Sequence, residues 1–109
     1  MVKSKIKGMF TEIFGDTPRN LIIEFFLEMG ELDFSIGDVA EELGMNRATA
    51  YNTFAELANK GYLVETRRVS GAQLYKLGAS KYEVKLLMKI FDMLLDDAVN
   101  KYRQDICIE

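Results

Sequence analysis

Capping residues and glycines divide the segment 35–77 into short, sharply bounded elements. Ser35 provides a helix-capping hydroxyl, and Gly44 allows the left-handed backbone with which many helices end. Asn46 is a second helix cap, and the helix that it begins is predicted to end near Gly61. Two helices joined by a short turn that contains glycine form a helix-turn-helix, so this spacing strongly restricts the fold.

The residues after the second helix are predicted to form a β-hairpin. Residues 62–66 and 73–77 alternate in polarity and are rich in β-forming residues, and Gly71 lies in the loop between them. Arg67 and Arg68 lie near the tip, where such a wing is suited to the minor groove or to flanking phosphates of DNA. The alternative is that both are edge charges that prevent sheet aggregation.

The outward face of the helix 46–60 is small and polar on a helical wheel. Ala50, Phe54 and Leu57 share the other side and are predicted to face the core. Small side chains would let the helix approach DNA bases, and asparagine can bond bidentately to adenine. The alternative is that these are ordinary solvated positions. The predicted DNA-contacting residues of the helix and the hairpin are Asn46, Arg47, Ala48, Thr49, Tyr51, Asn52, Arg67 and Arg68.

The first part of the chain is predicted to contain two helices and a strand. Residues 5–14 place apolar side chains at helical spacing, which predicts a short amphipathic helix docked on the core or on a partner chain. Residues 16–18 combine a capping side chain with a proline suited to a first helical turn, and predict a helix to about Met29. Residues 32–34 alternate, and we expect a short strand that pairs with the hairpin.

The last helix, predicted over 81–103, has more apolar surface than one core can cover. Its apolar side chains span an arc of about 240° on a helical wheel, whereas packing on one core needs about 100°. We therefore expect a two-fold homodimer through this helix. The alternative is a monomer in which the N-terminal helix covers the excess apolar surface of the last helix. The expected interface residues are Val84, Leu87, Met88, Phe91, Leu94, Leu95 and Ala98.

These elements predict a mainly α-helical fold with a small β-hairpin wing. It is a winged helix-turn-helix with an extended C-terminal dimerisation helix. We expect one compact domain in three parts: an N-terminal amphipathic segment over 1–15, the winged helix-turn-helix over 16–78, and the dimerisation helix and tail over 79–109.

The composition argues against several other classes of function. The 109 residues include one Cys and no His, which leaves no internal disulfide and no Cys/His zinc site within one chain. The sequence has no nucleophile–base pair or phosphate-binding loop, so we expect no catalytic activity, cofactor or metal. No apolar run approaches the ~18 residues of a membrane span. A lone thiol fits a reducing compartment, and we expect a cytoplasmic location.

The charge is unevenly distributed along the chain. The net charge is −3, yet residues 44–78 have five basic and two acidic residues, while residues 21–43 have seven acidic residues and no basic one. Local positive charge attracts a phosphate backbone, and this attraction outweighs the repulsion from the net negative charge of the whole chain. The predicted recognition helix and wing therefore form the most basic segment of the chain.

The chain resembles winged helix-turn-helix regulators of the ArsR/MarR-like superfamily, and its small archaeal members in particular. Residues 14–26 are similar to the opening L-G-D-P-T-R-x-x-I-L-x-x-L of ArsR-type proteins, residues 36–51 match the helix-turn-helix, and residues 60–64 and 74–77 match the wing. The resemblance implies a dimeric DNA-binding repressor or activator.

The chain also departs from the metal-sensing members of that superfamily. Those proteins have a Cys-x-Cys pair on the helix-turn-helix or His and acidic ligands on the last helix, whereas this chain has its one cysteine, Cys107, in the tail. A metal-sensing role is therefore not implied.

Two hypotheses about function follow. The first is a sequence-specific transcriptional regulator that binds double-stranded DNA as a homodimer, with the helix 46–60 in the major groove and the wing 66–73 on the flank. The second is a winged-helix protein-interaction module, such as a partition, anti-repressor or transcription-complex component. The acidic residues 24–42 and the net charge favour the second.

Overall fold

The computed structural model describes residues 8–106, with side chains described for residues 8–103. Cys107, on which the question of an intermolecular disulfide depends, lies outside these residues, as do the first residues of the predicted N-terminal helix. The elements, in chain order, are α2 (Met9–Phe14), α3 (Pro18–Met29), β1 (Phe34–Ser35), α4 (Ile36–Leu43), α5 (Arg47–Asn59), β2 (Leu63–Val69), β3 (Ala72–Leu77) and α6 (Tyr82–Ile106).

The predicted capping residues begin α3 and α4. The Thr17 hydroxyl accepts a hydrogen bond from the Asn20 amide at the start of α3, and Pro18 occupies the first turn. The Ser35 hydroxyl accepts from the Asp38 amide at the start of α4. Gly44 ends α4 with φ 65° and ψ 33°, the left-handed backbone that glycine adopts without strain.

The three strands form one antiparallel sheet in the order β1-β3-β2. The β2–β3 hairpin is the predicted wing, and Leu63 faces Leu77 at its base. The predicted short strand is confirmed, but it lies at Phe34–Ser35, and Phe34 faces Tyr75 of β3. The wing is thus anchored to the loop before α4 as well as to the end of α5.

The core lies where α3, α4, α5 and the base of the sheet meet. Phe26, Ile22 and Leu57 are fully buried there. Phe26 contacts Phe54 of α5 edge to face, and Phe54 in turn contacts Tyr75 of β3. These aromatic contacts connect α3 to α5 and then to the wing, so they fix the positions of α5 and the wing relative to each other.

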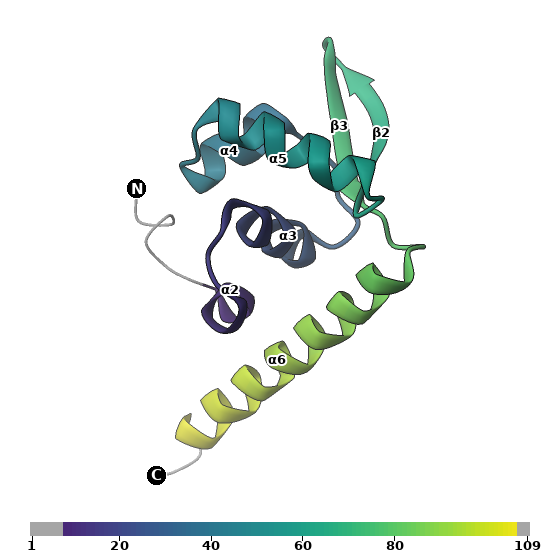
Figure 1. The fold of residues 1–109 in the computed structure, drawn as a ribbon. Coiled ribbons are helices and arrows are strands. Elements are labelled where there is room, and N and C mark those ends of the chain that lie inside the picture. Colours follow the sequence, from purple (N-terminus) through teal and green to yellow (C-terminus); the bar gives the residue numbers. More distant parts are fainter. Residues whose placement is uncertain (1–7, 107–109) are drawn as a thin grey trace.

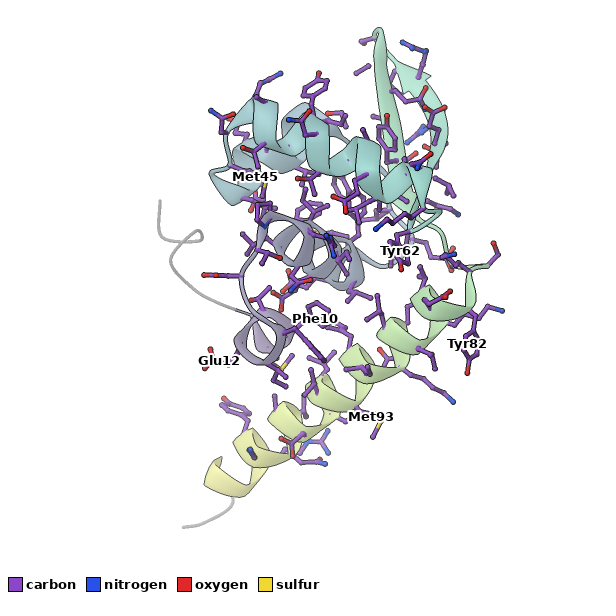
Figure 2. All side chains as sticks on the ribbon, viewed as in Figure 1. Phe10, Glu12, Met45, Tyr62, Tyr82 and Met93 are labelled. Carbon is purple, nitrogen blue, oxygen red and sulfur yellow. The ribbon has the colours of Figure 1, made fainter. Side chains whose placement is uncertain are left out.

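A buried carboxyl group holds α2 against α3. Glu24 is 5% exposed and accepts hydrogen bonds from the Phe10 amide at 3.1 Å and the Thr11 hydroxyl at 2.9 Å. A Cβ atom at Gly8 would overlap this carboxyl group, so the close approach requires glycine. Phe10 itself is buried and lies between α2 and α6 (Figure 2).

The helix α6 lies on the opposite side of α3 from α5 and the wing (Figure 1). Its N-terminal half packs on the body through Val84 and Phe91, and its C-terminal half extends past α2 (Figure 1). Among the described residues, no helix is long and apolar enough to cross a membrane.

Candidate nucleic-acid interface

The helix α5 presents the face that its sequence predicts. Ala50, Phe54 and Leu57 are buried at 0–1% exposure, which confirms the inward side of the wheel. The outward residues Arg47, Ala48, Tyr51 and Asn52 are exposed, and Thr49 is half-buried. Arg47 and Tyr51 line a groove whose other side consists of hairpin residues.

Asn46 is the N-cap residue of α5. Its Oδ1 atom accepts hydrogen bonds from the amides of Ala48 and Thr49, at 2.8 and 3.2 Å. These bonds satisfy two of the backbone donors that a helix start leaves free. The amide oxygen of Asn46 is therefore already engaged, although the residue is exposed as predicted.

A groove of about 390 Å³ separates the N-terminal ends of α4 and α5 from the wing. Arg47 and Tyr51 line it on the side of α5, and Arg68, Gln73 and Tyr75 line it on the side of the hairpin. Two guanidinium groups thus approach one groove from opposite walls, an arrangement suited to a phosphate backbone.

Arg47 reaches the groove over the first turn of α4. A Cβ atom at Gly37 would lie 3.0 Å from an Nη atom of Arg47, so glycine leaves room for the guanidinium group. The acidic residues Asp38 and Glu41 line the same groove. Their charges oppose an incoming phosphate, so the groove is of mixed charge and not uniformly basic.

The two wing arginines have different environments. The Nη1 atom of Arg68 donates a hydrogen bond to the Gly71 carbonyl at 3.0 Å, within the hairpin. Arg67 instead forms a bidentate pair with Asp33, through Nε at 3.0 Å and Nη2 at 3.2 Å. Hydrogen bonds from Arg67 and Thr66 lower the pKa of Asp33 to about 2. The same pair raises the pKa of Arg67 above its ordinary value.

Glu56 and Tyr75 adjoin the predicted surface. The Glu56 carboxylate of α5 binds Arg19 at 3.0 Å and Lys60 at 3.5 Å, so the one acidic residue of the recognition helix has cationic partners. Burial, together with the negative charge of Glu65, raises the pKa of Tyr75 above its ordinary value. The Tyr75 hydroxyl therefore remains a neutral hydrogen-bonding group at physiological pH.

Sequence reasoning missed Asp33, Gln73 and Tyr75 as part of this surface. The period of two along β3 places Gln73 and Tyr75 on one face, and this signal was available in the alternating sequence. Asp33 gave no such signal, because its partner Arg67 is 34 residues away in the chain.

The predicted interface residues of α6 divide into two groups. Val84 and Phe91 are 0% and 7% exposed and belong to the core of this chain, so they have no free surface to offer a partner. The prediction of contacts with a second chain therefore depends on the other members of the set. Leu87 and Leu94 are half-buried, and the exposed members of the set are Met88, Leu95 and Ala98.

Further apolar residues are exposed on α6 and on α2. Met93 is 70% exposed and Tyr82 is 70% exposed, and both lie on the side of α6 away from the body (Figure 2). Ile13 and Phe14 of α2 are 59% and 50% exposed. In residues 8–106, no group of three or more His, Cys, Asp or Glu side chains is arranged to hold a metal ion.

No protein-family model and no curated protein sequence matches this chain. Solved structures do match. A double mutant of Lactococcus lactis ZitR in its apo form superposes with a TM-score of 0.58 at 13% identity, over 80% of this chain and 63% of ZitR, so the chain spans less than two thirds of that protein. Reduced HlyU of Vibrio cholerae superposes with a TM-score of 0.58 at 19% identity, over 76% of this chain and 81% of HlyU.

A third similar structure is a homodimeric winged helix-turn-helix DNA-binding domain. It is Mb0332 of Mycobacterium bovis, a possible ArsR-family transcriptional regulator, with a TM-score of 0.56 and 18% identity over 84% of this chain and 80% of that one. Identities this low establish the architecture alone. The chain has the winged helix fold that these structures share, with a hairpin wing and a long C-terminal helix.

Proposed function

We propose that this protein is a sequence-specific DNA-binding transcriptional regulator that acts as a homodimer. The observation that carries the proposal is the groove between α5 and the wing, which Arg47 lines on one side and Arg68 on the other. The exposed, small and polar face of α5 lies directly beside it. The winged helix fold supports the same conclusion, since Mb0332 with this fold is a DNA-binding domain.

The proposed role of each side chain depends on whether it contacts base edges or phosphates. Ala48, Thr49 and Asn52 lie on the N-terminal half of α5, where a recognition helix meets base edges in the major groove. Asn52 is exposed and can bond bidentately to adenine. Arg47 and Arg68 neutralise phosphates, and these contacts give affinity without sequence preference.

The homodimer is proposed through the exposed apolar side of α6. The helix has 25 residues, and beyond Phe91 none of its described side chains is buried in this chain. Leu95 and Val99 remain 44% and 41% exposed, and large apolar surfaces of this kind mark protein interfaces. A two-fold dimer would present two copies of α5 to half-sites about 34 Å apart on the duplex.

A second candidate function is a winged-helix protein-interaction module. The acidic Asp38 and Glu41 in the groove favour it, because a basic peptide would complement them. No catalytic activity is part of either proposal. A regulator of this kind works where the DNA is, so a cytoplasmic location accompanies the first proposal.

Enrichment of bound duplexes from a random library is the decisive experiment. A DNA-binding dimer should enrich a pseudo-palindromic site, and the purified protein should retain weak affinity for any duplex at about 50 mM salt. Absence of all duplex binding at that salt concentration would overturn the DNA-binding proposal and favour the interaction module.

A further inference from the structure

Asp33 meets two residues from the middle of β2, Thr66 and Arg67. The Oδ2 atom of Asp33 accepts hydrogen bonds from the Thr66 hydroxyl at 2.7 Å and from Nε of Arg67 at 3.0 Å. Its Oδ1 atom accepts a third, from Nη2 of Arg67 at 3.2 Å. The side chain of Asp33 is only 16% exposed, so it is enclosed by these partners although it lies outside the core.

The strand β2 is irregular where these contacts form. Glu65 faces Tyr75 and Arg68 faces Gln73, so three steps along β2 correspond to two steps along β3. This is a β-bulge with one extra residue. Consecutive side chains of a regular strand point to opposite faces, yet Thr66 and its neighbour both reach one carboxylate. The bulge and the bonds to Asp33 therefore depend on each other.

The bulge also sets the direction of the next side chain. Arg68 follows it directly and lines the groove, opposite Arg47. Without the extra residue, every side chain beyond Glu65 would change faces of the strand. The orientation of Arg68 toward the groove is thus a consequence of the irregular register.

We infer that Asp33 is a positioning residue of the wing, which holds the β2 bulge through Thr66 and Arg67 so that Arg68 enters the groove, and that Arg67 is not itself a DNA contact. The inference rests on the proposed DNA-binding function. The lowered pKa of Asp33 agrees with this geometry, because the hydrogen bonds from Arg67 and Thr66 stabilise the charged carboxylate.

The test is the salt dependence of binding to a mixed-sequence duplex, between about 50 and 200 mM salt. Each neutralised phosphate contributes about 0.9 to the slope of log affinity against log salt. Arg68→Ala removes two such contacts from the proposed homodimer and should reduce the slope by about 1.8, whereas Arg67→Ala should change it by less than about 0.3. In an Asp33→Asn background, Arg68→Ala should also change the slope by less than about 0.3, because Arg68 is no longer positioned.

Glu31→Gln is the matched control. It removes the same charge from an exposed residue of the same loop, two residues before Asp33. We expect Asp33→Asn to bind the duplex at least about threefold more weakly than Glu31→Gln, a difference typical of coupled residues. The inference is overturned if Arg67→Ala reduces the slope as much as Arg68→Ala does, or if Asp33→Asn binds the duplex as tightly as Glu31→Gln or more tightly.

A measurement without DNA separates this inference from the proposed function. In amide NMR spectra of the free protein, Asp33→Asn and Arg67→Ala should shift the same resonances in residues 63–77, whereas Glu31→Gln should leave them in place. If the wild type binds no duplex, the proposed function fails, and shared shifts still establish Asp33 as the residue that holds the wing. If Asp33→Asn leaves the hairpin resonances unmoved, the inference fails even where DNA binds.

Discussion

The exposed apolar side of α6 leads to a specific prediction about dimerisation. Leu95 is 44% exposed and lies on the part of α6 beyond its buried contacts with the body. Leu95→Glu would place a carboxylate in the proposed interface without removing a core residue. We expect the variant to remain helical and folded, and to dissociate into monomers at concentrations where the wild type is dimeric.

The magnitude follows from the burial of Leu95. Full burial of a leucine side chain contributes about 1.5–3 kcal/mol, and less than half of Leu95 remains to be buried, so each copy contributes about 1 kcal/mol. A two-fold interface loses this contribution twice, about 2 kcal/mol in total, which raises the dissociation constant about 30-fold. Desolvation of the two carboxylates adds to the loss, so about 30-fold is a lower bound.

Sedimentation equilibrium over a dilution series measures this constant, and circular dichroism checks that the helices are intact. Met93→Glu is the matched control, because it introduces the same charge at a residue that is 70% exposed and outside the proposed interface. It should change the dissociation constant by less than about threefold. If Leu95→Glu leaves the association of the chains unchanged, or if the wild type is monomeric, dimerisation through this side of α6 is refuted.

Three further predictions concern the recognition helix, the N-terminal helix and the wing. Asn52→Ala should reduce discrimination at one base pair by about 1–3 kcal/mol in competition binding. Asn59→Ala, at the far end of the same helix, should leave this discrimination unchanged. If the two variants have equal effects, Asn52 does not recognise a base. Glu24→Ala leaves the buried Phe10 amide without an acceptor and leaves the Thr11 hydroxyl only the Gly8 carbonyl, so it should lower the free energy of unfolding by about 1–3 kcal/mol in urea titrations. Exposed Glu12→Ala should lie within about 0.5 kcal/mol of wild type. The pKa of Asp33 is about 2 in the folded protein and 3.8 ordinarily, so its stabilising contribution is complete above pH about 4 and is lost as the pH falls toward 2. Acid titration of Asp33→Asn should lack this part of the pH dependence, and an unchanged profile would contradict it.

Much of the fold could be predicted because its signals are local. The caps at Thr17, Ser35 and Asn46 begin helices wherever the chain continues with suitable residues, and the structure contains all three. The inward face of α5 followed from helical periodicity, since Ala50 and Phe54 are separated by about one turn. The polar face that the proposal assigns to DNA follows from the same periodicity.

The different environments of the two wing arginines depend on pairing between distant segments. In the sequence, Arg67 and Arg68 are adjacent arginines near a hairpin tip with nothing to distinguish them. Only the register of β2 against β3 shows that their side chains have different surroundings. One binds Asp33 and the other lines the groove. A bulge of one residue changes the face of every later side chain, and alternation in the sequence cannot locate it.

The sequence by itself determined the order of elements, the caps, the buried side of α5 and the excess of apolar surface on α6, because each depends on neighbours within a few residues. The tertiary structure decided which part of that apolar surface stays free. Val84 and Phe91 are buried in the core of their own chain, while Met88 and Leu95 remain exposed. The covered residues share a core cluster with Phe10 of α2, the helix that Glu24 holds against α3, and such contacts between distant segments leave no periodic signal in the sequence.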